Sequence, residues 1–268
     1  MDIPVFHNDQ HGTAVVVMAG LKNALLIKQK KLEESKIVIN GAGAAGIAIF
    51  KLLVHAGAKF ENIYICDTKG VIYEGRGLGM TTYKNEVASQ NVDKDTPLDE
   101  ICIGADVLIG VSSGGQFTKK TLKKMNEGPI IFALSNPEPE ILPQQAKEFR
   151  PDCMIATSLP EWSNQINNVI CFPFLFRAVL DTMCTEINNE MLMAAANAIA
   201  AIPIEEVPDS VLKACPDRHF TFGPHYFVPF ALDPRLLERV ACAVAEAAQE
   251  TKVAKQPIKN INEYRGFL

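Results

Sequence analysis

The run from His7 to His11 near the start of the sequence contains three side chains that can bind metal ions: His7, Asp9 and His11. A carboxylate on a rigid backbone can hold Mg²⁺ or Mn²⁺, which prefer oxygen ligands. By spacing alone, the three side chains could instead form a nitrogen-rich, zinc-like site. Asp9 or His11 could also cap a helix that begins near Thr13, and composition alone favours this third interpretation.

A glycine-rich turn follows the first apolar run of β-branched residues. Gly41, Gly43 and Gly46 have the spacing Gly-x-Gly-x-x-Gly and lead directly into a helical pattern. In such a context the first glycine permits a tight turn, the second lets the backbone approach a pyrophosphate, and the third lets the helix pack on the strand. The turn therefore predicts a dinucleotide site, although glycines can also do no more than shape a turn.

The residues near this turn could favour either NAD or NADP as the bound dinucleotide. Ala44 and Ala45 lie at the helix N-terminus, where unpaired N–H groups favour phosphate. Asp67 ends the next apolar run, where a carboxylate can accept hydrogen bonds from the adenosine ribose or can simply cap the strand. Its charge would repel a 2′-phosphate, which favours NAD. Lys69 and Arg76 are close enough in sequence to compensate, so NADP is also possible.

Short polar loops follow three further apolar runs, at residues 112–115, 135–137 and 157–158. Ligands of open parallel sheets bind outside the carboxyl ends of the strands. We therefore expect these loops, and Ser112 in particular, to wall the cofactor site. Any one of them could equally be an ordinary turn.

The elements that would position these residues alternate between strand and helix along most of the chain. Apolar runs this short, separated by helical patterns, are typical of parallel strands buried on both faces. The fold class expected is α/β, with a Rossmann-like, doubly wound, mainly parallel sheet and a helical C-terminal extension. We expect one dinucleotide-binding domain over residues 1–268, made of a lead-in motif and helix (1–35), a Rossmann core (36–175) and the extension (176–268). The expected strands are 37–39, 63–67, 107–111, 130–134 and 154–156, and the expected helices are 13–34, 47–54, 118–125, 144–149, 177–185, 189–201 and 235–248.

The amino-acid composition indicates which classes of binding partner can be excluded. The 268 residues carry a net charge of −5, which argues against nucleic acid or an anionic membrane as a partner. Short lysine clusters at residues 28–31 and 119–124 are interpreted as solvated helix faces. The 7 Cys are an odd number and favour a reducing compartment. No signal peptide or membrane-spanning run is expected, so we expect a soluble, cytoplasmic protein.

Several motifs together resemble one enzyme family. Residues 4–14 read PVFHNDQHGTA, residues 132–139 read FALSNPEP and residues 164–169 read NQINNV. In this order they resemble the cofactor domain of bacterial-type malic enzymes, and the resemblance covers essentially all 268 residues. Further matching segments are 39–46, 105–112 and 172–177.

The resemblance implies roles for individual residues. Asp9 falls on a ligand of a divalent metal, Mg²⁺ or Mn²⁺. Asn136 falls on the Asn of an Asn-Pro motif near nicotinamide and malate, and Asn167 and Asn168 fall on a pair that helps to bind the substrate carboxylate and the cofactor. The expected cofactor contacts are Thr13, Gly41, Gly43, Ala44, Ala45, Gly46, Asp67, Ser112, Asn136 and Asn167.

The resemblance also implies a reaction. Malate would pass hydride from C2 to NAD or NADP and then lose CO₂, with the metal as Lewis acid, to give pyruvate. The family's tyrosine acid, lysine base, substrate-binding arginine and Glu-Asp metal pair belong to a segment that would precede residue 1. No catalytic residue is therefore assigned, and we expect the chain alone to be inactive. Many relatives have Asp at the position of Asn8, which leaves the charge around the base open.

Two other functions fit the same pattern. The chain could be the cofactor domain of another NAD-dependent dehydrogenase, such as an amino-acid dehydrogenase. It could also be a binding module that takes up dinucleotide without catalysis. In each case a homodimer or higher homo-oligomer is plausible, because the C-terminal part is rich in helices.

Overall fold

The computed structural model describes residues 3–216 and 218–268, and the chain divides into two compact units. One unit, here called the sheet unit, comprises residues 24–166. The other, here called the helical unit, combines residues 1–23 with residues 167–268. The helix α1 (Thr13–Lys28) spans the boundary in sequence. The domain boundaries expected at residues 35 and 175 stay a prediction.

The sheet unit is built on a 6-stranded sheet with the order β3-β2-β1-β4-β5-β6. Five strands are parallel, and the short β3 pairs antiparallel with β2 at the edge. This order is that of a doubly wound dinucleotide-binding sheet, so the expected fold is confirmed. The five expected strands are all present, and β3 was missed. The strands are β1 (Ile37–Asn40), β2 (Ile63–Asp67), β3 (Gly70–Val71), β4 (Val107–Gly110), β5 (Ile130–Ala133) and β6 (Met154–Thr157).

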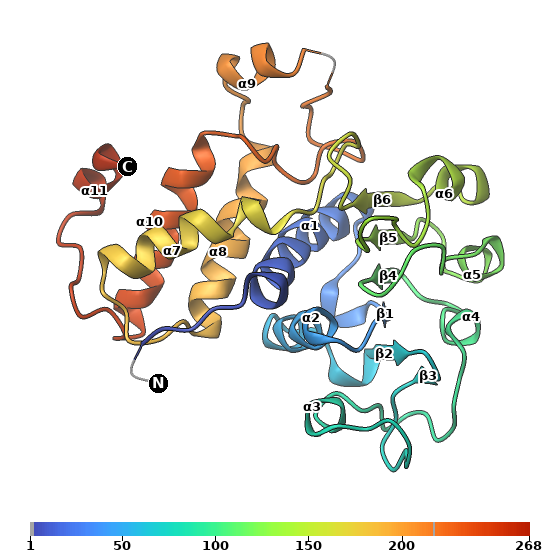
Figure 1. The fold of residues 1–268 in the computed structure, drawn as a ribbon. Coiled ribbons are helices and arrows are strands. Elements are labelled where there is room, and N and C mark those ends of the chain that lie inside the picture. Colours follow the sequence, from blue (N-terminus) through green and yellow to red (C-terminus); the bar gives the residue numbers. More distant parts are fainter. Residues whose placement is uncertain (1–2, 217) are drawn as a thin grey trace. The chain divides into compact units, whose positions relative to one another are not determined.

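Helices cover both faces of this sheet. In Figure 1, α2 lies on one face, and α4, α5 and α6 lie on the other. Strands covered on both sides are nearly continuous apolar runs, and every residue of β1, β4, β5 and β6 is buried. The helices of this unit are α2 (Ala44–His55), α3 (Thr82–Asn85), α4 (Leu98–Ile101), α5 (Lys119–Lys123) and α6 (Pro143–Phe149), with 3₁₀ turns at Leu32–Glu34 and Phe60–Asn62.

The helical unit has its core between three helices. The helix α10 packs against α8 and α7, and its buried face is made mostly of alanine and valine, which let helix backbones approach closely. The last helix, α11, is fastened by Tyr264, whose Oη donates to Asp181 Oδ2 at 2.7 Å. The elements of this unit are a π-helical turn (Asn8–Gly12), a 3₁₀ turn (Asn168–Ile170), α7 (Phe172–Asp181), α8 (Asn189–Ala201), a 3₁₀ turn (Ile202–Ile204), α9 (Asp209–Ala214), α10 (Arg235–Glu250) and α11 (Ile261–Phe267).

Most expected helices differ from the observed bounds by one to three residues, and two differ by more. The helix expected over 13–34 ends at Lys28, because Gln29 adopts a φ of 54°. The helix expected over 177–185 begins at Phe172 and ends at Asp181. Pro173 lies in its first turn, where its missing N–H costs nothing, and Met183 beyond its end has a φ of 48°. The helix expected over 189–201 is confirmed.

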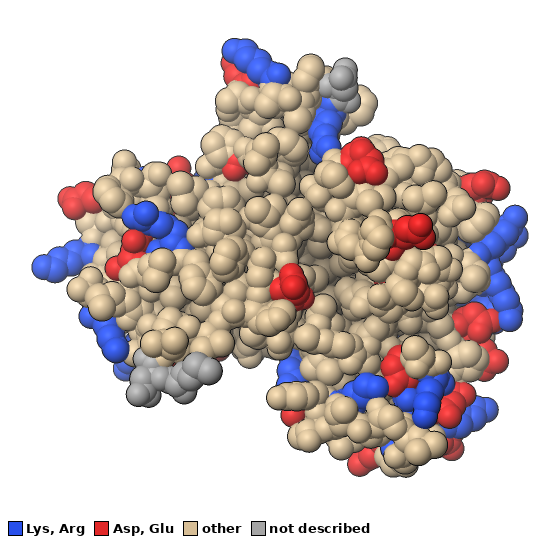
Figure 2. Space-filling model, viewed as in Figure 1, with Lys and Arg blue, Asp and Glu red and all other residues tan. Residues whose placement is uncertain are grey.

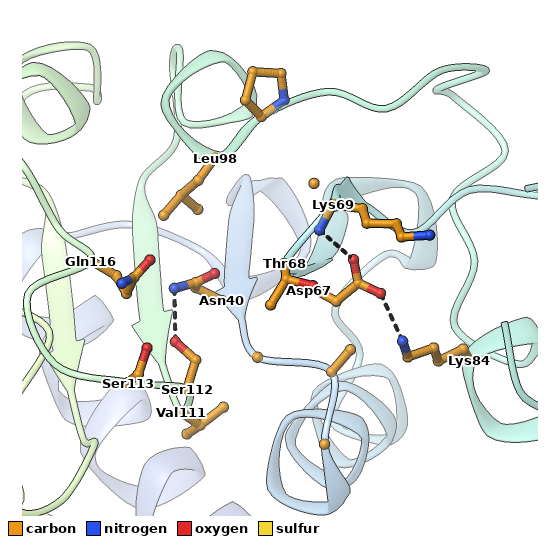
Figure 3. Close-up of a pocket in the computed structure, with 15 residues that line it drawn as sticks. Asn40, Asp67, Thr68, Lys69, Lys84, Leu98, Val111, Ser112, Ser113 and Gln116 are labelled. Carbon is orange, nitrogen blue, oxygen red and sulfur yellow. Dashed lines mark hydrogen bonds and ion pairs between the residues drawn. The ribbon is translucent and has the colours of Figure 1, made fainter. Parts of the chain in front are cut away.

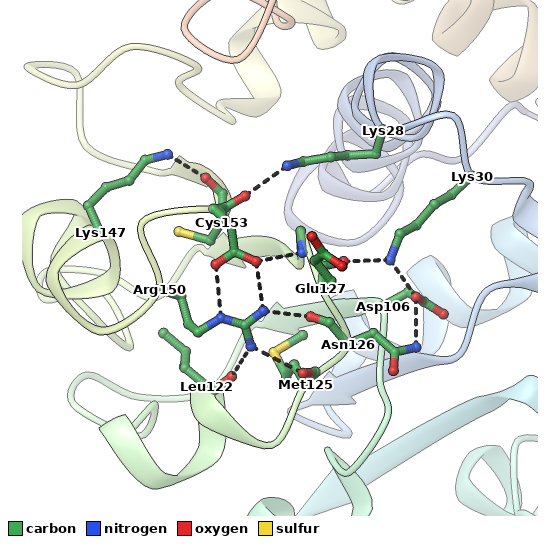
Figure 4. Close-up of polar contacts among 12 residues, drawn as sticks. Lys28, Lys30, Asp106, Leu122, Met125, Asn126, Glu127, Lys147, Arg150 and Cys153 are labelled. Atoms are coloured by element: carbon green, nitrogen blue, oxygen red, sulfur yellow. Dashed lines mark hydrogen bonds and ion pairs between the residues drawn. The ribbon is translucent and has the colours of Figure 1, made fainter.

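The lysine cluster at residues 28–31 is only partly solvated, which corrects the sequence interpretation. Lys28 Nζ donates to the carbonyl of Asp152 at 2.8 Å, and Lys30 Nζ contacts Asp106 Oδ1 at 2.6 Å (Figure 4). Nearby, Arg150 donates to three carbonyls at the end of α5 and just beyond it, and pairs with Asp152. These bonds join loops that precede β4, β5 and β6. The amino edge of the sheet is therefore tied together by polar contacts.

The charged surface is mixed. On the face drawn in Figure 2, acidic and basic side chains alternate over the part of the sheet unit that carries α3 and β3. Within the described residues, no helix is both long enough and apolar enough to span a bilayer.

Candidate functional site

A cavity of about 580 Å³ lies at the carboxyl edge of the sheet, between the ends of β1, β2 and β4. This is the edge where doubly wound sheets bind their ligands. Figure 3 shows that polar side chains from the ends of all three strands border it. The residues lining it are Asn40, Gly41, Ala42, Gly43, Asp67, Thr68, Lys69, Gly70, Lys84, Pro97, Leu98, Val111, Ser112, Ser113 and Gln116.

The three glycines of the turn are needed for different reasons. Gly41 has a φ of 128°, and a Cβ there would lie 2.6 Å from the carbonyl oxygen of Val111. A Cβ at Gly46 would overlap the carbonyl oxygen of Gly41. A Cβ at Gly43 would meet nothing within 4 Å, because this position faces the open cavity. Gly41 and Gly46 therefore shape the turn, and Gly43 keeps space free for a ligand.

The N-terminus of α2 opens beside this turn. The helix begins at Ala44, and its N-cap residue Gly43 has no side chain that could cap the first N–H groups. Ala44 is exposed and Ala45 is half-buried, so the backbone here can be approached from solvent. Uncapped N–H groups together with the helix dipole make a site for an anion such as pyrophosphate.

Asp67 at the end of β2 is held by three donors. Arg76 Nη2 lies 2.8 Å from each of its oxygens, Lys84 Nζ donates to Oδ2 at 2.7 Å, and the backbone N–H of Lys69 donates to Oδ1 at 3.0 Å. Burial alone would raise the pKa of Asp67, but these hydrogen bonds outweigh it and lower the pKa below its ordinary value. The Asp67 charge is therefore fixed and largely neutralised.

The sequence interpretation missed two members of this region. Lys84 lies on the short helix α3 and belongs to no motif, so nothing in the sequence links it to Asp67. Asn40 donates from Nδ2 to Ser112 Oγ at 3.0 Å and joins the ends of β1 and β4. Its position could have drawn notice, because a polar residue ends an apolar strand directly before the glycine turn.

The loop after β5 carries Asn136, and it contacts the loop after β6. Asn136 Oδ1 accepts from Ser158 Oγ at 3.2 Å, and the same hydroxyl lies 3.3 Å from the carbonyl of Ser135. The Asn136–Pro137 peptide bond is cis. Two of the three loops expected as site walls are thus joined by hydrogen bonds.

The remaining candidates lie in the helical unit. Asp9 is exposed, and its Oδ1 accepts from Asn168 Nδ2 at 3.1 Å. Asn167 Oδ1 accepts from the N–H of Val169 at 3.1 Å and so caps a 3₁₀ turn. Thr13 is half-buried and begins α1. Asp9 and Asn168 are thus brought together by the fold, although 159 residues separate them.

The zinc-like interpretation of the segment 7–11 is wrong, because across residues 3–216 and 218–268 no three His, Cys, Asp or Glu side chains gather as a metal site would require. The helix-cap interpretation of Asp9 and His11 stays a prediction: the N-cap residue of the π-helical turn is His7, whose own side chain makes no cap hydrogen bond. Burial, and then the charge of His7, lower the pKa of His11, whose Nδ1 accepts from the N–H of His7 at 3.1 Å.

Sheet order, glycine turn, free helix N-terminus and strand-end acid together define the sheet unit as a Rossmann-type dinucleotide-binding fold. The comparison with known families agrees. The family model described as "Malic enzyme, NAD binding domain" matches residues 10–214, and the chain belongs to this family.

Similar proteins have been described in several organisms. The NADP-dependent malic enzyme of Salmonella typhimurium is 47% identical over 264 residues, which are 98% of this chain and 35% of that sequence. The NAD-dependent malic enzyme of Rhizobium meliloti is 46% identical over 264 residues, which are 98% of this chain and 34% of that sequence. The crystal structure of Entamoeba histolytica malic enzyme has a TM-score of 0.88 at 31% identity, and the match covers 100% of this chain and 53% of that one. The chain spans about a third of the length of these two curated relatives.

Proposed function

We propose that this chain is the cofactor-binding part of an enzyme that converts malate to pyruvate and CO₂ while reducing a nicotinamide dinucleotide. The family match over residues 10–214 carries the proposal, because it takes in the glycine turn, Asn136 and the pair Asn167 and Asn168. The relatives that are named malic enzymes support the same reaction. The chemistry of hydride transfer belongs to the cofactor, and the protein binds and orients it.

The residues of this chain would act mainly by binding. The turn at Gly41–Gly46 and the N-terminus of α2 would hold the pyrophosphate. Asn136, Asn167 and Asn168 can donate from their amide groups to carboxylate or nicotinamide oxygens. These assignments of individual residues are proposals.

A divalent metal would need more than these residues. Asp9 offers one carboxylate, and one of its oxygens already accepts from Asn168. Mg²⁺ prefers six oxygen ligands in an octahedron, and the residues the structure describes contain no group of three acidic, His or Cys side chains placed for a metal. Asp9 therefore fits as one ligand of a site that the described residues do not complete, and no step of the reaction is assigned to a metal.

At the adenosine end we propose that the site takes NADP in preference to NAD. The preference for NAD expected from the sequence rests on repulsion between Asp67 and a 2′-phosphate. Arg76 and Lys84 both pair with that carboxylate, and Lys69 and Lys84 line the cavity beside it. Three cationic side chains around one neutralised acid favour an additional phosphate.

Binding of reduced cofactors tests this proposal through their fluorescence. The unmodified chain should bind NADPH more tightly than NADH. Lys84→Met should weaken NADPH binding about tenfold and change NADH binding less than about twofold, because only NADPH carries the 2′-phosphate. Lys123→Met, which removes an exposed lysine of α5, serves as the matched control and should change neither affinity. Tighter binding of NADH by the unmodified chain would refute the NADP assignment and leave the dinucleotide site intact.

A further inference from the structure

Glu140 is a completely buried acidic residue in the loop that follows β5. Its exposed fraction is 0%, and its two oxygens point at different loops. Oε1 accepts from the backbone N–H of Ser112 at 3.1 Å, and Oε2 accepts from the backbone N–H of Ser135 at 3.1 Å. One carboxylate thus joins the chain directly after β4 to the chain directly after β5.

The surroundings of Glu140 are shaped to receive a carboxylate. At Gly110, the last residue of β4, a Cβ would overlap the Glu140 carboxyl group, so only glycine leaves room for it. In the part of the chain that the structure describes, no Lys or Arg side chain pairs with Glu140. Burial raises the pKa of Glu140, and the N–H bonds from Ser112 and Ser135 oppose that effect. A buried acid is costly unless hydrogen bonds compensate for the lost water, and both oxygens of Glu140 accept such bonds from the backbone.

The two loops that Glu140 joins belong to different parts of the proposed cofactor site. Ser112 lines the cavity at the carboxyl edge. Ser135 directly precedes Asn136, the residue proposed for the nicotinamide side. The glycine turn and Asp67 follow β1 and β2, and among the residues that the structure describes no hydrogen bond or ion pair joins Glu140 to them. Glu140 therefore contacts the β4 and β5 side of the site directly, and the β1 side only through Ser112, whose Oγ accepts from Asn40.

We propose that Glu140 is a positioning residue that sets the backbone of Ser112 relative to Asn136, so that both parts of a bound dinucleotide are held in register. The two N–H groups point at different ends of the side-chain terminus, so each end must carry an acceptor atom. An ionised carboxylate has this property, whereas a glutamine amide presents one acceptor and one donor. This inference rests on the proposed dinucleotide site.

The test compares Glu140→Gln with Glu148→Gln, an exposed glutamate of α6 that serves as the matched control. Affinities for NADPH and for ADP are measured by titration, and the amide protons of Ser112 and Ser135 are followed by NMR. In Glu140→Gln we expect one of the two amide protons to move upfield, because it loses its carboxylate acceptor. NADPH affinity should fall about tenfold and ADP affinity less than about twofold, because ADP is held by the β1 and β2 side. Glu148→Gln should change none of these.

Gly110→Ala should also break the hydrogen bonds of Glu140, because the added methyl group would displace the Glu140 carboxyl group. It should shift both amide protons and reproduce the selective loss of NADPH affinity. Equal losses for NADPH and ADP, or unchanged amide protons in Glu140→Gln, would overturn the inference. An unmodified chain that binds neither NADPH nor ADP would instead overturn the proposed function, while the amide protons would still report whether Glu140 holds the two loops.

Discussion

A substitution at Gly43 should change dinucleotide affinity without changing the stability of the fold. A side chain there meets no protein atom within 4 Å, so Gly43→Val should fold with an unchanged melting temperature. The added isopropyl group would lie in the cavity where the pyrophosphate must approach the backbone, so dinucleotide affinity should fall more than about tenfold. Calorimetric titration with NADPH measures this effect.

Gly266→Val is the control for that substitution, because its position in α11 is equally open. It should bind dinucleotide like the unmodified chain. A folded Gly43→Val protein with unchanged affinity would mean that the pyrophosphate lies elsewhere.

The residues of the glycine turn could be predicted from the sequence. The contacts that Arg76 and Glu140 make near the site could not. Gly41, Gly43 and Gly46 are adjacent along the chain, so their spacing is visible in one dimension. Arg76 was named only as a neighbour in sequence, and its bidentate pairing with Asp67 depends on how the chain folds back after β3. Glu140 lies in a loop rich in proline, and nothing local indicates that its carboxyl enters the interior.

At the scale of elements, the amino edge of the sheet should contribute to stability. Asp152 accepts from Gly128 N at 2.6 Å and pairs with Arg150, which in turn binds the end of α5. The Arg150 guanidinium holds the pKa of Asp152 well below its usual range. Asp152→Asn should therefore lower the free energy of unfolding by roughly 1 kcal/mol near neutral pH.

This difference should depend on pH with a definite sign. A carboxyl whose pKa is depressed by folding stabilises the fold above its unfolded pKa of about 3.9, and the stabilisation is lost as pH falls toward the folded value. Urea denaturation at several pH values should give a gap between the unmodified chain and Asp152→Asn that is constant above about pH 5 and shrinks below it. Asp93→Asn, at an exposed position, should show no such gap. A gap that is constant down to pH 2 would contradict the assignment.

Elements with a strong periodic or apolar signal were predicted, and elements stabilised by their neighbours were not. The five parallel strands are continuous apolar runs, and α8 has a long helical pattern, so both were visible in the sequence. The strand β3 has only two residues and exists because it pairs with β2. The helix α3 has four residues and is fixed by Thr81, whose side chain accepts from the N–H of Lys84.

At the scale of the whole molecule, we expect this chain alone to bind dinucleotide without oxidising malate. Asp9 is proposed as a single metal ligand, and the described residues offer no completed metal site. With malate, Mn²⁺ and NADP, the isolated chain should produce no NADPH above background, measured by absorbance. A protein that carries this chain together with the family's catalytic residues should produce NADPH, and Asp9→Ala in that protein should lower turnover about a hundredfold or more while NADP affinity is kept. Robust turnover by the isolated chain would mean that an acid and a base lie among its own residues.

The helical unit is assembled from both ends of the chain, and this affects the order in which the protein can form during synthesis. Asn23 is buried, and its side-chain amide donates to the carbonyls of Ala200 and Phe227 at 2.9 Å each. On a ribosome, residues 1–23 emerge before the sheet unit, yet the segments they pair with are made only after the whole sheet unit. At about 5 to 20 residues per second, that wait lasts on the order of ten seconds or more. Residues 1–23 would thus reach their places later than the sheet unit that follows them, and an apolar segment such as Val15–Val17 would need protection from aggregation in the meantime.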